Sequence, residues 1–327
     1  MRYLGITLIL SLSTLIWTSC EKKEQPYPLP EPGTANFEKL DIGDAYEYHL
    51  FYSFQNGLIK TDSFEIWDLC FTQDLDAFEI WLNGGKGNLI YKTTSTDFSE
   101  TPANIPNAFW KYDEPTWIKN KSAYGLIHTE DLDFIWLLKT NQHTYKFKIL
   151  SINDENNILI QIGRLNDSEG TIHQLTRNSS TNYLYLSAKN GLVNVEPPKE
   201  NWDVLFTRYR HIFYGVNPDG SDLPYYVNGV LLNPYQTLGA ADTLTPRVFD
   251  NLELEEALEA YELTSQRDII GYHWKEVNIN NAEYTVLPER VYLVKDQESR
   301  LWKIHFVNFY SNNGQKGKPQ FEFQRLN

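Results

Sequence analysis

Several stretches of the chain alternate between apolar and polar residues, which is the pattern of a β-strand with one face in a core. Tyr145, Phe147 and Ile149 alternate with lysines, and near the C-terminus Glu322 stands between two phenylalanines. Successive side chains of a strand point to opposite faces of its sheet. Both stretches therefore predict strands with one apolar face.

Two Asn-Gly pairs, Asn56-Gly57 and Asn190-Gly191, lie between strand-like runs, and this is a strong signal for a tight β-hairpin. Aromatic residues make up 14% of the chain, which also favours strands. One segment, 250–261, has the periodicity of an amphipathic helix, with its glutamates mostly opposite the apolar face. The sequence predicts an all-β fold of mainly antiparallel sheets with one or few short helices.

Four landmarks recur in the same order in the two halves of the chain. The clearest is a Trp-Asp pair followed by Phe and Thr, which begins at Trp67 and again at Trp202. The other pairs are Tyr48–Ser53 with Tyr183–Ser187, Tyr145–Ile149 with Trp302–Phe306, and Ile160–Leu165 with Phe321–Leu326. Four matches in order favour tandem duplication. We expect two tandem β domains, 39–168 and 169–327, that meet at a polar stretch.

The N-terminus has the pattern of a lipoprotein signal peptide over residues 1–19. Arg2 supplies the positive start, an apolar run follows that is shorter than a membrane-spanning helix, and Cys20 comes after small residues. An ordinary secreted protein cleaved nearby is the alternative. If Cys20 is diacylated, residues 20–38, which are rich in proline and charge, form a lipidated flexible tether. This predicts a lipid anchor in the outer membrane and exposure at the cell surface.

Charge and cysteine content exclude some classes of function. Without residues 1–19 the chain has 28 basic and 43 acidic residues, a net charge of −15, which disfavours nucleic-acid binding and contact with an anionic membrane except through the lipid. Besides Cys20 the only cysteine is Cys70, which cannot form an internal disulfide with a lipidated partner. Cys70 lies in an apolar run, and we interpret it as a small buried hydrophobe.

No catalytic motif is present, so we do not expect an enzyme. The chain has no nucleophile elbow, no metalloprotease motif and no glycine-rich dinucleotide loop, and its seven histidines show no zinc spacing. Asp68 and Asp203 belong to the same repeated motif, which indicates a structural task such as bonding a turn amide. His211 and His273 are more informative, because aromatic residues surround both; the alternative is that they are ordinary surface histidines.

The second half resembles the HmuY-type haem-binding lipoproteins of the Bacteroidetes. The resemblance rests on the run from Asn201 to Tyr209, on the run from Ile304 to Tyr310 with the glycines at 314 and 317, and on the closing Phe-Glu-Phe. It covers about 172–326, and the first half carries a degenerate form of the same motif. The resemblance implies two HmuY-like β domains in a protein that takes haem and passes it to a TonB-dependent outer-membrane receptor.

The family's axial haem ligands are His or Met, and here the sequence restricts the choice. Its only methionine is Met1, which is lost when the signal peptide is cleaved, so the ligands must be His or, less typically, Tyr. His211 and His273 are the candidate axial ligands, and Tyr209, Tyr272 and Trp274 are the candidate pocket residues. The alternative is a protein that kept the fold, lost haem ligation and recognises a glycan, a peptide or a receptor partner.

Overall fold

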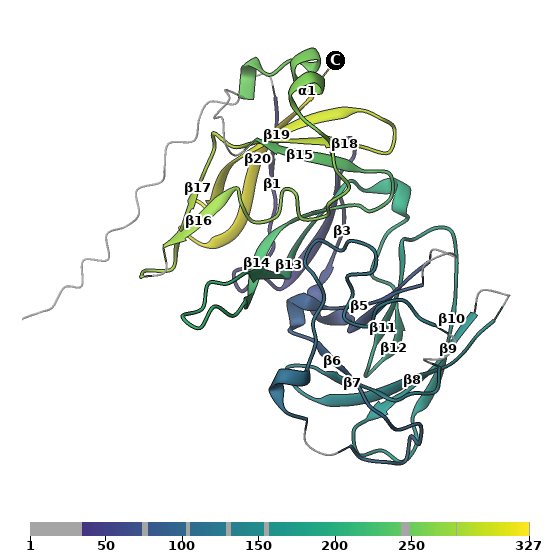
Figure 1. The fold of residues 1–327 in the computed structure, drawn as a ribbon. Helices are drawn as coiled ribbons and strands as arrows, with labels where there is room; N and C mark the ends of the chain where they lie inside the picture. The colour runs from purple at the N-terminus through teal and green to yellow at the C-terminus, as the bar shows by residue number, and fades with distance from the viewer. Residues whose placement is uncertain are drawn as a thin grey trace, which may run out of the picture.

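The structure is a computed structural model, and it describes residues 35–73, 78–102, 105–128, 132–153, 157–242, 249–278 and 280–326. Antiparallel sheets dominate this part of the chain, as the sequence predicts (Figure 1). Cys20, the signal peptide and most of the predicted tether lie outside the described residues. No helix in the described ranges is long and apolar enough to cross a membrane.

Four of the sheets form the body of the molecule. Outer sheet 1 has the order β1 (Asn36–Lys39), β20 (Lys316–Leu326), β19 (Leu301–Tyr310), β18 (Val291–Lys295) and β15 (Leu238–Asp242). Inner sheet 1 has the order β14 (Leu223–Leu232), β13 (Val204–Phe213), β2 (Tyr48–Ser53) and β3 (Gly57–Ser63). Inner sheet 2 has the order β12 (Gly191–Val193), β11 (Tyr183–Ser187), β4 (Leu69–Thr72) and β5 (Ile80–Leu82). Outer sheet 2 has the order β10 (Thr171–Thr176), β9 (Asn157–Arg164), β8 (Thr144–Ile152), β7 (Trp136–Lys139) and β6 (Leu89–Lys92).

Smaller elements complete the fold. A two-stranded ribbon joins β16 (Lys275–Asn278) and β17 (Glu283–Val286). The predicted helix is shorter than expected: α1 covers Leu254–Ala260, after the 3-10 turn η6 (Phe249–Asn251). Leu258, which we placed on the apolar face, is 59% exposed. The remaining 3-10 turns of the described residues are η1 (Phe64–Ile66), η2 (Gly84–Lys86), η3 (Asn107–Phe109) and η5 (Lys199–Asn201).

Three apolar cores separate these layers, and strand alternation explains their order. Along β2, Leu50 and Tyr52 point into the core against outer sheet 1, whereas Phe51 points into the core between the two inner sheets. Along β4, Phe71 faces outer sheet 2, whereas Cys70 joins the core between the inner sheets. The central parts of β2 and β4 are therefore buried on both faces, which is why residues 50–52 and 69–71 are unbroken apolar runs. Cys70 is buried, as predicted.

Both predicted Asn-Gly hairpins are confirmed. Gly57 and Gly191 pair with the last residues of β2 and β11, and they have φ angles of 77° and 78°. A left-handed backbone of this kind favours glycine, because it has no Cβ. Each hairpin is short and tightly closed, so it can be placed in a sheet as one unit.

The predicted division at residue 168 does not separate the sheets. We call residues 36–164 the first repeat and 171–326 the second, because their elements follow the same order. The hairpin β2–β3 of the first repeat pairs with β13 of the second, and the hairpin β11–β12 of the second pairs with β4 of the first. In the same way β1 pairs with β20, and β10 pairs with β9. The two repeats thus exchange their N-terminal strands, and long-range pairing overrides their order in the sequence.

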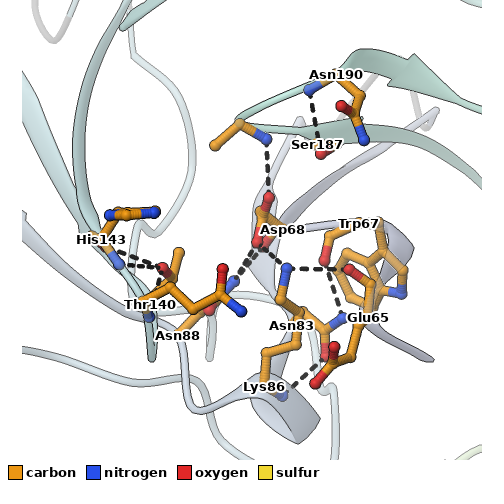
Figure 2. A network of polar contacts seen from close by, with 12 residues as sticks. Glu65, Trp67, Asp68, Asn83, Lys86, Asn88, Thr140, His143, Ser187 and Asn190 are labelled. Carbon is orange, nitrogen blue, oxygen red and sulfur yellow. Dashed lines mark hydrogen bonds and ion pairs between the residues drawn. The ribbon is translucent and has the colours of Figure 1, made fainter. Parts of the chain in front are cut away.

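The two Trp-Asp motifs anchor this exchange, and their carboxylates have the predicted structural task of bonding a backbone amide. Asp203 accepts a hydrogen bond from the backbone N–H of Phe54 at 2.7 Å, and Asp68 accepts one from Ala188 at 2.8 Å. Phe54 and Ala188 are the first residues after β2 and β11, so each carboxylate holds the hairpin that comes from the other repeat. Figure 2 shows the surroundings of Asp68. The tryptophans Trp67 and Trp202 meet in the core between the inner sheets.

Candidate functional site

The strand β13 carries the first candidate ligand on its outer end. It pairs with β2 only over Val204–Phe206, whereas its pairing with β14 continues to Phe213. The outer half of the β13–β14 hairpin therefore extends beyond the rest of inner sheet 1 (Figure 1). Alternation along β13 puts Tyr209, His211 and Phe213 on one face. Phe213 was not among the predicted pocket residues, although this alternation indicates it.

A loop that crosses β14 brings the second candidate ligand to the first. Val230 and Gly271 form an antiparallel bridge with hydrogen bonds of 2.9 and 3.0 Å. The crossing is close: a Cβ built on Gly229 would lie 2.3 Å from the carbonyl oxygen of Gly271. Only glycine permits this approach. The bridge places Tyr272 and His273 directly after it, beside His211.

His211, Tyr272 and His273 form one aromatic cluster, although 61 residues separate the first two in the chain. The ring centres of His211 and His273 are 6.1 Å apart, and their planes are perpendicular. Tyr272 lies 4.9 Å from His211 and 4.3 Å from His273, and Phe213 lies 4.9 Å from His211. We call these four residues the histidine cluster. Two imidazoles that bind opposite sides of one metal, each at about 2 Å, have ring centres roughly 6 Å apart.

Burial keeps both imidazoles in the form that can ligate a metal. Loss of solvent lowers the pKa of His211 and of His273, and the carboxylate of Asp268 opposes this shift in both. A neutral imidazole has a free nitrogen lone pair. The Nδ1 atom of His211 is buried and has no hydrogen-bond partner among the described residues. Because a buried polar atom usually has a partner, this atom suits a bound ligand.

The other two predicted pocket residues lie deeper. Tyr209 is buried below the cluster, in a small core with Val227, Leu231 and Tyr272. Trp274 is 1% exposed, and its indole stacks on Phe306 at 4.2 Å in the core of outer sheet 1. Of the three predicted pocket residues, only Tyr272 has a ring contact with both histidines. A histidine pair fits a metal that brings its other ligands with it, as haem iron does. In the described ranges, no group of three or more His, Cys, Asp or Glu side chains could hold a metal ion.

The sheet layers define an all-β protein, and the histidine cluster is its candidate ligand site. The chain belongs to the HmuY family, which is a family of binding proteins and matches residues 45–323. The match runs through both repeats, so it covers more of the chain than residues 172–326, on which the resemblance in the sequence rests. The predicted family is thus confirmed, and so is the all-β fold.

Several solved structures are similar to this chain at low sequence identity. The match to the apo HmuY analog (TFO) of Tannerella forsythia covers 92% of this chain and 100% of the analog, with 10% sequence identity and a TM-score of 0.27. Apo PinO of Porphyromonas gingivitis is 10% identical, covers 90% and 99%, and has a TM-score of 0.27. A putative HmuY-like heme binding protein of Bacteroides vulgatus is 13% identical, covers 91% and 95%, and has a TM-score of 0.23. No curated protein sequence matches the chain.

Proposed function

We propose that this protein binds haem at the histidine cluster, with His211 and His273 as the two axial ligands. The observation that supports this most directly is the 6.1 Å separation of the two imidazole centres, which suits one iron between them. The family supports the same ligand, because the family match and the Bacteroides vulgatus neighbour both concern HmuY-type proteins.

The residues of the cluster have distinct tasks in this proposal. His211 and His273 each present a nitrogen to the iron, and burial keeps both neutral. Tyr272, which contacts both rings, and Phe213 supply flat apolar surface for a macrocycle. The bridge between Val230 and Gly271 fixes the distance between the two ligand-bearing segments. Haem itself would supply the iron and the visible absorption, and the protein would hold the haem in place.

A haemin titration tests this assignment. We expect a sharp, shifted Soret band that saturates at about one equivalent, as for a six-coordinate iron with two imidazoles. The double variant His211→Ala, His273→Ala should lose this spectrum. The matched control is His128→Ala, His143→Ala, which removes two exposed imidazoles outside the histidine cluster and should bind as the wild type does. A broad change that does not saturate, or a spectrum that survives the first double variant, rejects the assignment.

We also propose that Cys20 carries the lipid that attaches the protein to the outer membrane, facing the cell surface, and that a TonB-dependent receptor receives the haem. The sequence pattern around Cys20 supports the anchor, and family membership supports the receptor. Cys20→Ala should release the chain from membrane fractions, whereas Cys70→Ala should leave it there. A Cys20→Ala chain that stays in the membrane fraction would overturn the anchor.

A further inference from the structure

A cavity lies where the first repeat meets the β11–β12 turn of the second, and it contains no residue of the histidine cluster. It has a volume of about 140 Å³. Its walls come from three places: the loop 140–143 between β7 and β8, the segment 65–68 with Lys86, and the turn 187–190 between β11 and β12. Except for Ile66, every lining residue has a polar group on its side chain. The proposed haem site uses none of these residues.

The floor of this cavity is a fixed polar network, which Figure 2 shows. The Asp68 carboxylate accepts hydrogen bonds from the Ala188 backbone and from Asn88, and it forms an ion pair with Lys86. Lys86 also donates to the carbonyl of Glu65 at 3.0 Å. An ammonium group has three donors, so these two contacts leave one N–H of Lys86 for a ligand. The floor is thus rigid before any ligand arrives.

The opposite wall is a tight loop with exposed side chains. The Thr140 hydroxyl accepts hydrogen bonds from the backbone N–H groups of Gln142 and His143, and this closes the turn. Asn141, Gln142 and His143 are exposed, so the cavity has access to solvent from this side. In Figure 2, Thr140 and His143 lie across from Asp68, with Ser187 and Asn190 on a third side.

At the corresponding place in the second repeat, side chains of the chain itself reach across. There the loop between β18 and β19 is one residue longer, 296–300 in place of 140–143. Gln297 of this loop reaches across and donates to the Trp202 carbonyl at 2.6 Å and to Thr237 at 3.1 Å. Arg300 binds Asp296 at 2.6 Å and reaches Gln55 at 3.3 Å, on the turn that corresponds to 187–190. In the second repeat the side chains of this loop thus reach across to the neighbouring segments, whereas the loop 140–143 of the first repeat is one residue shorter.

The chemistry of the walls selects a small neutral ligand rich in hydroxyl groups. Two carboxylates, Glu65 and Asp68, face two ammonium groups, Lys86 and Lys189, so the site has no formal net charge from these groups. Its amides and hydroxyls both donate and accept hydrogen bonds, as sugar hydroxyls do. The volume corresponds to on the order of ten waters, which suits one sugar ring and is well below the roughly 300 Å³ of a drug-sized pocket.

We propose that this cavity, which we call the loop-140 site, binds a single neutral monosaccharide unit. Hydrogen bonds from Lys86, from Asn190 and from the loop 140–143 hold the sugar in place of bound water. The inference is independent of haem binding, because the two sites share no residue.

Saturation-transfer NMR on the intact chain tests the loop-140 site, with glucose, galactose, mannose and N-acetylglucosamine as probes at millimolar concentration. At least one sugar should receive saturation and compete with an unlabelled excess of itself. The decisive variant replaces Thr140–His143 with the sequence Asp-Gln-Glu-Ser-Arg of residues 296–300, which should fill the cavity and abolish the signal. His143→Ala should weaken binding several-fold.

Two controls keep the result interpretable. Asn313→Ala changes an exposed turn between β19 and β20 and should leave sugar binding unchanged. The double variant His211→Ala, His273→Ala should lose haem but keep the sugar, so failure of one proposal is distinguishable from failure of the other. If no sugar binds the wild type, or if binding survives the loop replacement in a chain whose circular dichroism is native, the loop-140 site is rejected. If glycine or glutamate receives saturation from the protein and no sugar does, the site does not bind a monosaccharide and the proposed ligand class is wrong.

Discussion

The Asp203 carboxylate accepts a 2.7 Å hydrogen bond from the backbone N–H of Phe54, which lies 149 residues earlier in the chain. The relationship between Asp68 and Ala188 repeats it at 2.8 Å and 120 residues. Each bond joins a strand that follows a Trp-Asp motif to a hairpin from the other repeat. The two bonds therefore hold the exchanged hairpins in place. A change at Asp203 should loosen the β2–β3 hairpin, and a change at Asp68 should loosen the β11–β12 hairpin.

Replacement of Asp203 by alanine should destabilise the fold by about 1–3 kcal/mol, because the buried Phe54 N–H loses its acceptor. Urea unfolding measures this loss, and hydrogen exchange locates it: exchange should accelerate in β2 and β3 more than in β14. Glu200→Ala, an exposed carboxylate in the preceding turn, is the matched control and should change little. Equal acceleration in all three strands would contradict a specific hold on the hairpin.

The pH dependence of stability should contain a term from Asp113. Burial raises the pKa of this carboxyl to about 7, although it accepts hydrogen bonds from the backbone of Leu82 and Ala123. In the unfolded chain it titrates near 3.9. Its proton therefore stabilises the folded state fully below about pH 4, and this contribution is lost as the pH rises to about 7.

The variant Asp113→Asn isolates this term, because it cannot titrate. The stability of the wild type relative to Asp113→Asn should fall by about 2 kcal/mol between pH 5 and pH 7.5, measured by urea unfolding. A difference that stays constant over this range would mean that Asp113 is ionised throughout.

Cys70 should be inert in the folded protein. It is fully buried between the inner sheets, and burial raises the pKa of its thiol well above the usual value, so little thiolate forms. In a chain with Cys20→Ser, a thiol reagent should not react until denaturant is added, after which one thiol reacts. Asn312→Cys in the same background places a thiol on an exposed turn and should react at once. Rapid reaction of Cys70 in the native chain would show that the core between the inner sheets opens.

Haem affinity should persist below pH 6.5 and weaken only at lower pH. Burial lowers the pKa of His211 and His273, so both stay neutral to more acidic pH than a free histidine, and protonation ends ligation. The carboxylate of Asp268 opposes this lowering in both histidines, so Asp268→Asn should lower both pKa values further. The lowest pH at which haem still binds, which we call the acid limit, should then move down. Soret titrations at a series of pH values measure this limit. An acid limit that moves up in the variant would contradict the proposed electrostatics.

The sequence alone determined the kind of fold, because strand alternation and Asn-Gly turns are local signals. It also determined the structural task of Asp68 and Asp203 and the burial of Cys70, since each depends on a short motif or on an apolar run. His211 and His273 could be singled out because aromatic neighbours stand beside them in the sequence.

Only the tertiary structure decided which strands pair, since a hairpin fits the sheet of either repeat and the choice depends on contacts 100 or more residues apart. The same is true of sites made from several segments. The meeting of His211 with His273 depends on a glycine bridge across β14, and the burial of Trp274 depends on which way that loop turns. The loop-140 site is open because one loop is a residue shorter than its counterpart, and that effect exists only where three segments converge.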